Sequence, residues 1–90
     1  MNWRIEFNKQ AAKEFKKLDR LIANRILDFL TNRLSKLNDP RLIGEALKGS
    51  ILGEFWKYRV GDFRIICEIQ DKKLLIIILR IGDRKYIYNQ

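Results

Sequence analysis

The spacing of apolar residues changes period along this chain, and that change constrains its fold more than any other feature. Near the N-terminus, polar residues alternate with Trp3, Ile5 and Phe7, which is typical of a half-buried strand. Two amphipathic helices are then indicated by apolar residues three or four positions apart, at Ala11, Ala12, Phe15 and Leu18 and at Ile22, Ile26, Phe29, Leu30, Leu34 and Leu37. From Phe55 onward the alternation of strands returns. This order predicts an α+β fold, β-α-α-β-β-β, in which a helical hairpin packs on one face of a small twisted antiparallel sheet.

Local signals set the ends of these elements. Asn8 and Asp19 are suited to cap the two helices, and Asn38-Asp39-Pro40 ends the second, because proline disfavours a helical conformation in the residue before it. Residues 40–54 are irregular, with at most one helical turn around Glu45. Four strands are predicted, at residues 55–60, 63–69, 74–81 and, as a short last strand, 86–88. We expect residues 1–90 to form a single domain.

The composition excludes several classes of protein. A single Cys cannot form an internal disulfide, which favours a reducing cytoplasm, and the absence of His removes the usual acid–base catalyst and the commonest zinc ligand. The longest apolar stretch is six residues, Leu74 to Leu79, and the N-terminus has no apolar signal segment, so no membrane partner is expected. The formal charge of +8 is consistent with a polyanionic partner or with solubility alone.

Alternation along the strands predicts which side chains share a face. Tyr58 and its neighbours Trp56 and Val60 form the better core face, so Lys57 and Arg59 should point outward, and Arg64 should join them on the same exposed surface. Periodicity does not orient Arg80, because hairpin loops of even and odd length give opposite answers. The candidate patch combines cations with aromatic rings that can stack on bases: Lys57, Arg59, Arg64, Arg84, Tyr86 and Tyr88. A nucleic-acid surface and a merely solvated sheet face both remain open at this point.

Two segments resemble the RelE/ParE toxin superfamily. The first consists of Ala46-Leu47-Lys48-Gly49-Ser50 and then Gly53-Glu54-Phe55-Trp56-Lys57-Tyr58-Arg59-Val60-Gly61-Asp62-Phe63-Arg64-Ile65-Ile66. The second is Leu79-Arg80-Ile81-Gly82-Asp83-Arg84-Lys85-Tyr86-Ile87-Tyr88. The resemblance implies a twisted sheet with a helical hairpin, and a toxin that a cognate antitoxin, acidic and partly disordered, wraps and silences. RelE-like members cleave messenger RNA in the ribosomal A site without metal or other cofactor, whereas ParE-like members inhibit DNA gyrase.

The same resemblance implies the site residues of a RelE-like enzyme. The catalytic set would be Lys57, Arg64, Arg84 and Tyr88, and Arg59 matches a neighbouring sheet arginine of the family. Tyr86 has no firm family counterpart; with Arg59, Arg80 and Lys85 it forms the candidate RNA-binding set. The chain departs from the family pattern at Asp83, where many relatives have His or a basic residue, and at Phe55, where the best-studied members have a second lysine.

Metal-free RNA cleavage uses the 2′-hydroxyl of the substrate to attack the adjacent phosphate. It needs a base, cations for the charge that grows on phosphate, and an acid for the leaving 5′-oxygen. We expect Tyr88 to act as the base or an orienting group, and Lys57 or Arg64 as the acid or a phosphate clamp. The alternatives are a ParE-like gyrase inhibitor without nuclease activity, and a decayed toxin that only binds its antitoxin.

Overall fold

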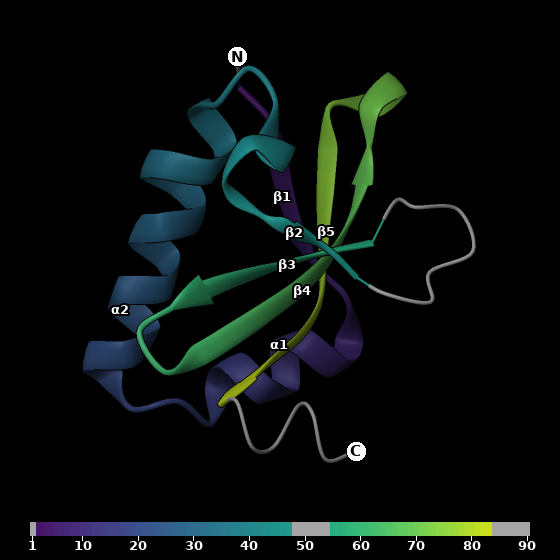
Figure 1. The fold of residues 1–90 in the computed structure, drawn as a ribbon. Coiled ribbons are helices and arrows are strands. Elements are labelled where there is room, and N and C mark those ends of the chain that lie inside the picture. The colour runs from purple at the N-terminus through teal and green to yellow at the C-terminus, as the bar shows by residue number, and fades with distance from the viewer. Residues whose placement is uncertain (1, 48–54, 84–90) are drawn as a thin grey trace.

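A computed structural model describes residues 2–47 and 55–83, which form a five-stranded sheet with two helices (Figure 1). The strands are β1 (Arg4–Phe7), β2 (Glu45–Ala46), β3 (Phe55–Val60), β4 (Phe63–Gln70) and β5 (Leu75–Asp83), and their order in the sheet is β1-β5-β4-β3-β2. The helices are α1 (Lys9–Lys16) and α2 (Arg20–Asp28). The predicted α+β class is confirmed.

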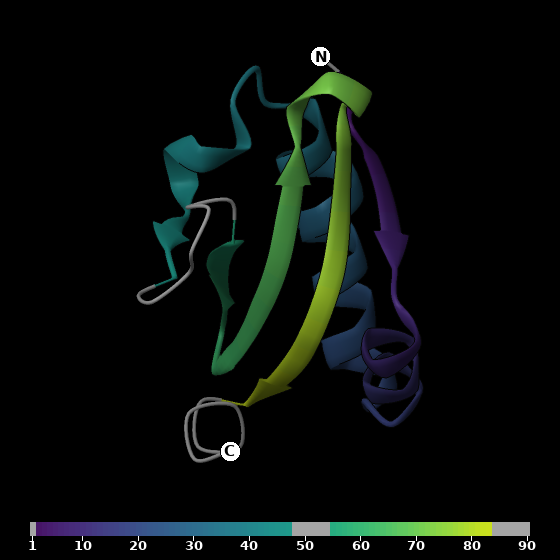
Figure 2. The ribbon, with the colours of Figure 1, turned by 90° about the vertical axis from the view of Figure 1, so that its right-hand side faces the viewer.

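Both helices begin at the predicted caps. The side chain of Asn8 accepts from the N–H of Ala11 at 2.8 Å, and that of Asp19 accepts from the N–H of Ile22 at 3.0 Å. After Asp28 the helical path continues through a π turn and a 3₁₀ turn to Lys36, before the predicted break. Figures 1 and 2 show α2 running along one face of the sheet, with α1 lying across its start at the β1–β5 edge.

The sheet is mixed, whereas the sequence predicted an antiparallel one. β3, β4 and β5 form the expected antiparallel run, but β1 pairs with β5 in parallel, with Ile5 opposite Ile76. Alternation within a strand shows which residues share a face and says nothing about the neighbouring strand. The partner of β1 lies about 70 residues away, so only the folded chain reveals it.

Three local predictions need correction. Glu45–Ala46 is a short strand paired with β3 instead of a helical turn. Leu74 adopts a left-handed conformation with φ of 47°, so β5 begins one residue later than predicted. β5 also extends through Gly82 to Asp83, which were expected in a turn. The strand predicted at residues 86–88 lies outside the described residues.

The hydrophobic core lies between one face of the sheet and the helical segment that runs from α2 through the π and 3₁₀ turns. Ile26, Leu30 and Leu34 are fully buried there, together with alternate residues of β4 and β5: Ile65, Cys67, Ile69, Ile76 and Ile78. Burial raises the pKa of the Cys67 thiol to about 12, so this side chain packs in the core as an unreactive thiol. Because the helices occupy this face, the opposite face is the one left for a ligand. Within the described ranges, the helices are too short and too polar to cross a bilayer.

Candidate functional site

The open face of the sheet carries four cations on three adjacent strands, β3, β4 and β5. Lys57 lies opposite Ile66, and Ile66 lies opposite Arg80, which gives one row across the sheet. In the next row Arg59 lies opposite Arg64, and Arg64 lies opposite Gly82. Neighbouring strands are about 4.8 Å apart, so these rows span about 10 Å across the sheet. The structure therefore brings together Lys57, Arg59, Arg64 and Arg80.

A β-bulge decides the orientation of Arg80. The β4–β5 loop pairs Gln70 with Leu75, a register that would place Arg80 opposite Ile65 on the core face. Between Ile66 and Cys67 the register shifts by one residue, and Leu79 is the extra residue on β5. Arg80 consequently lies on the open face, in the same row as Lys57. Loop length alone, the criterion available from sequence, gives the opposite face.

Arg64 shares the predicted face but is buried, where the sequence predicted exposure. Only 9% of its surface is accessible. Its Nη1 donates to the carbonyl oxygen of Phe63 at 3.2 Å and reaches that of Gly61 at 3.5 Å. These contacts fix the guanidinium beside the β3–β4 turn, where Gly61 adopts a φ of +60°. A guanidinium held in this way is preorganised to bind a phosphate oxygen.

The two cations of β3 differ in their surroundings. Arg59 is exposed, as predicted. Lys57 is half-buried, and its Nζ lies 3.8 Å from Oε2 of Glu45 on β2. Because Glu45 is largely exposed, this ion pair contributes little to stability and can be exchanged for a ligand at low cost.

Arg80 is held by Glu14 of α1, a residue that the sequence reasoning missed. Nε and Nη2 of Arg80 each lie 3.0 Å from Oε2 of Glu14. Burial raises the pKa of the Glu14 carboxyl, but the hydrogen bonds from Arg80, the Ile81 backbone and Gln10 outweigh it, so the pKa lies below its ordinary value. A signal was present in the sequence: Glu14 falls on the apolar stripe of α1, between Ala11 and Leu18.

The remaining predicted site residues lie outside the described part of the chain. They are Arg84, Lys85, Tyr86 and Tyr88. β5 ends at Asp83, directly before this segment, in the register position opposite Phe63. Their assignment therefore stays a prediction.

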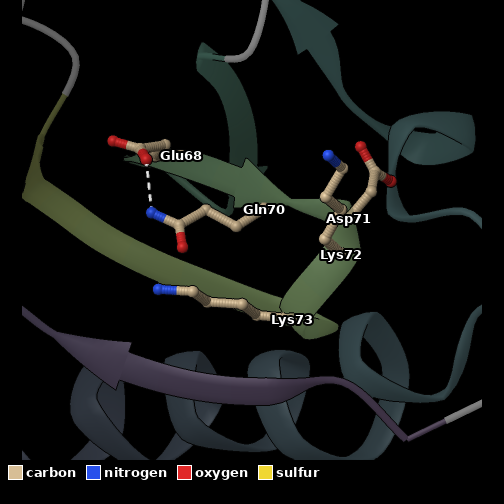
Figure 3. Close-up of a pocket in the computed structure, with 5 residues that line it drawn as sticks. All are labelled: Glu68, Gln70, Asp71, Lys72 and Lys73. Carbon is tan, nitrogen blue, oxygen red and sulfur yellow. Dashed lines mark hydrogen bonds between the residues drawn. The ribbon is translucent and has the colours of Figure 1, made fainter.

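At the other end of the open face, beside the β4–β5 turn, side chains of both charges line a hollow. This hollow has a volume of about 410 Å³ and is lined by Glu68, Gln70, Asp71, Lys72 and Lys73 (Figure 3). Glu68 accepts a hydrogen bond of 2.6 Å from Gln70, which Figure 3 shows as a dashed line. Both carboxylates and ammonium groups line this hollow, whereas the predicted site residues that the structure describes, Lys57, Arg59, Arg64 and Arg80, do not.

Asp71, at the rim of this hollow, belongs to a structural contact. Arg41 donates to it through Nη2 at 2.7 Å and Nη1 at 3.1 Å, which lowers the pKa of the Asp71 carboxyl. This bidentate pair ties the β4–β5 turn to the 3₁₀ turn Pro40–Ile43.

A second hollow, of about 320 Å³, lies between α1 and β5. It is lined by Gln10, Lys13, Glu14, Lys17 and Ile81, so the cationic character of the open face continues around the sheet edge onto α1. As for metal ligands, residues 2–47 and 55–83 contain no cluster of three or more His, Cys, Asp or Glu side chains that could hold an ion.

Comparison with known proteins identifies the family. Residues 5–88 match the family model of the ParE toxin of the type II toxin–antitoxin system parDE. The chain is 28% identical over 90 residues to toxin RelG of Mycobacterium tuberculosis, which covers all of both proteins. It is 24% identical over 85 residues to the mRNA interferase toxin RelE of Escherichia coli K12, covering 94% of this chain and 86% of that protein.

A solved structure supports the same conclusion. The toxin–antitoxin complex RelBE2 from Mycobacterium tuberculosis contains a chain that superimposes with a TM-score of 0.81 at 25% identity, covering 93% of each chain. The agreement spans the mixed sheet, the two helices and nearly the whole sequence. The chain belongs to the RelE/ParE superfamily and is a toxin of a type II toxin–antitoxin system.

Proposed function

We propose that this toxin is an endoribonuclease that cleaves messenger RNA in the A site of the translating ribosome. The observation that carries the proposal is the open sheet face, on which Lys57, Arg59, Arg64 and Arg80 occupy two adjacent rows of three strands. The resemblance to a protein named mRNA interferase toxin supports the same chemistry. A surface of this kind binds the charge of an RNA backbone and concentrates cations where a phosphate would react.

In the proposed reaction the 2′-hydroxyl oxygen attacks the adjacent phosphorus atom. The new oxygen–phosphorus bond closes a 2′,3′-cyclic phosphate, and the bond to the 5′-oxygen of the next nucleotide breaks. The attacking hydroxyl gives its proton to the base, for which the resemblance suggests Tyr88, and the departing 5′-oxygen takes a proton from the acid. No metal or other cofactor is required by this scheme.

The surroundings of the described cations suit them to different roles in this reaction. Arg64 is the better phosphate clamp, because its guanidinium is fixed by the carbonyl oxygens of Phe63 and Gly61, and guanidinium groups in proteins keep their protons. Lys57 is the better acid, because its side chain is partly exposed on the open face and its 3.8 Å ion pair with the largely exposed Glu45 is weak. Arg59 is exposed and suits the neighbouring phosphates of the strand.

The partner of this toxin is proposed to be a cognate antitoxin with an acidic, partly disordered chain. The similarity to a chain solved as a toxin–antitoxin complex supports a protein partner. The charge of +8 on 90 residues favours an acidic one. Ribosome and messenger RNA are the proposed target, and the cytoplasm the proposed site of action.

A second candidate function is inhibition of DNA gyrase, because the matching family model is that of the ParE toxin. The two activities are separated by assaying one preparation for A-site cleavage on programmed ribosomes and for supercoiling by gyrase. Cleavage without gyrase inhibition supports the proposal, and the reverse result replaces it with the second candidate. A chain inactive in both assays that still binds its antitoxin is a decayed toxin, which refutes both.

Variants at the site test the assignment of residues. We expect Lys57→Ala, Arg64→Ala, Arg84→Ala and Tyr88→Phe to lower the single-turnover rate about 100-fold or more, the range measured for removal of a group that stabilises a transition state. Lys72→Ala, on the β4–β5 turn, and Arg20→Ala, at the start of α2, remove the same charges elsewhere and should cut at the wild-type rate. Wild-type rates for folded site variants would refute the assignment.

A further inference from the structure

Glu14 is buried at the edge of the proposed active face, where its carboxylate contacts Arg80, Ile81 and Gln10. Oε1 accepts from the backbone N–H of Ile81 at 2.7 Å and lies 3.3 Å from Nε of Arg80. Oε2 accepts from Nε of Arg80 at 3.0 Å and from the amide of Gln10 at 3.2 Å, and lies 3.0 Å from Nη2 of Arg80. Only 9% of Glu14 is accessible, against 29% of the Arg80 side chain.

The topology explains why a carboxylate occupies this position. β1 ends at Phe7. The next residue, Asn8, still donates its backbone N–H to the carbonyl oxygen of Ile78 on β5. Beyond that point α1 replaces β1 beside β5, so the N–H of Ile81 has no strand to pair with on that side. Glu14 supplies the acceptor and closes the edge immediately after the bulge at Leu79.

The same contacts fix the guanidinium of Arg80. The bulge brings Arg80 to the open face, and the carboxylate then binds the Nε–Nη2 side of its planar group, a geometry that selects one orientation. A buried carboxylate is stable only when it is paired, so Glu14 depends on Arg80. Lys13 and Lys17 of α1 line the same hollow as Glu14, and the ion pair of its carboxylate is with Arg80, 3.0 Å away.

We propose that Glu14 is a positioning residue, which fixes Arg80 in the row of Lys57 so that its guanidinium meets the RNA backbone already oriented. This inference rests on the proposed function. If Glu14 did not hold it, the Arg80 side chain would become ordered only when RNA binds. The free-energy cost of that ordering would weaken RNA binding or slow the reaction. Glu14 is 9% accessible and binds the guanidinium of Arg80, so in this proposal it acts on the substrate through Arg80.

The first experiment tests the hold on Arg80 without any measurement of activity. In ¹⁵N-labelled protein, the Arg80 Nε–H should give a resolved NMR signal in slow exchange with water. Glu14→Gln keeps an acceptor for the Ile81 N–H but removes the charge, and should speed the exchange at Arg80 about tenfold or more. Glu68→Gln removes a carboxylate from the far end of the open face and should leave the signal unchanged. Equal exchange in wild type and Glu14→Gln would overturn the inference.

The second experiment separates positioning from a structural role. On programmed ribosomes, Glu14→Gln should lower kcat about three- to tenfold, the range expected for immobilising one long side chain, while KM stays equal or falls because a negative charge is lost. In an Arg80→Ala background the same substitution should change kcat no further. A loss of the same size in both backgrounds would contradict a role through Arg80.

A further variant covers the case in which Glu14→Gln does not fold, as shown by circular dichroism. Arg80→Lys keeps the charge opposite Glu14 but loses the planar fork, and should also lower kcat at least threefold. A wild-type kcat for Arg80→Lys would overturn the inference. If the wild-type chain cuts no RNA, the proposed function fails and Glu14 has no role in cleavage, whereas the NMR experiment still decides whether Glu14 holds Arg80.

Discussion

Replacing Tyr58 by Phe removes one buried hydrogen bond from the strand that carries Lys57 and Arg59. The Tyr58 hydroxyl donates to the carbonyl oxygen of Pro40 at 2.7 Å, and only 2% of the residue is accessible. The substitution leaves that carbonyl without its donor in a site that water does not reach. The net loss of such a bond, together with the unsatisfied acceptor, is about 1 to 2 kcal/mol. For a domain of this size it corresponds to a fall in Tm of about 5 to 15 °C.

The assay is chemical and thermal unfolding followed by circular dichroism. The urea midpoint should fall by about 1 M with no change in slope, since Phe fills the same volume against Phe29 and Gly44. Thr31→Val removes an exposed helical hydroxyl that donates to the carbonyl oxygen of Leu27, and should change stability by less than about 0.5 kcal/mol. An unchanged midpoint for Tyr58→Phe would refute the argument.

Alkaline pH gives the same hydroxyl a second test. Burial raises the pKa of Tyr58 well above its ordinary value of 10.0. The folded state therefore retains a proton that the unfolded chain releases, and stability should fall as the pH rises above about 10. Tyr58→Phe should flatten this alkaline decline. If the free energy of unfolding fell equally steeply with pH in the two proteins, the hydroxyl would not be buried as described.

Three further substitutions test other parts of the fold. Gly44→Ala should destabilise by about 1 to 3 kcal/mol, because the new Cβ would lie 2.6 Å from Cε1 of the Tyr58 ring; a wild-type Tm would contradict this close approach. The pKa of Glu14 lies below its ordinary value of 4.5, so its contribution to stability is complete above that pH and is lost as the pH falls through the folded pKa. Glu14→Gln should therefore reduce the fall in the free energy of unfolding as the pH is lowered below about 4.5. The same fall in both proteins would exclude that contribution. Arg41→Ala should raise the pKa of Asp71 toward its ordinary value in an NMR titration while costing no more than about 1 kcal/mol, because Asp71 is largely exposed; an unmoved titration would argue against the pair.

The sequence predicts those features that depend on local pattern. Asn8 and Asp19 cap the helices because a side-chain oxygen placed before an apolar stripe satisfies the first free N–H groups of a helix. Tyr58 faces the core and Arg59 faces solvent, because alternation alone separates the two sides of β3. Lys57, Arg59 and Arg64 therefore share a face, as the alternation indicates.

The features that the sequence does not predict depend on contacts between distant segments. Arg80 reaches the open face through a bulge whose extra residue, Leu79, is one more apolar residue in an apolar run. The hold of Glu14 on Arg80 joins positions 66 residues apart. Arg64 is buried because its guanidinium turns back onto the β3–β4 turn, which no alternation pattern describes. Each of these determines how a cation of the site is presented.

Mapping of 5′ ends in messenger RNA after brief expression of the toxin in cells tests the central claim most directly. New 5′ ends should appear within the coding sequence of a reporter and should be absent when its start codon is removed and translation stops. Expression of Arg64→Ala at the same level should leave no such ends, whereas Arg20→Ala should give the wild-type pattern. Ends that persist without translation, or cutting by Arg64→Ala at the wild-type level, would contradict cleavage on the ribosome by the cationic face of this sheet.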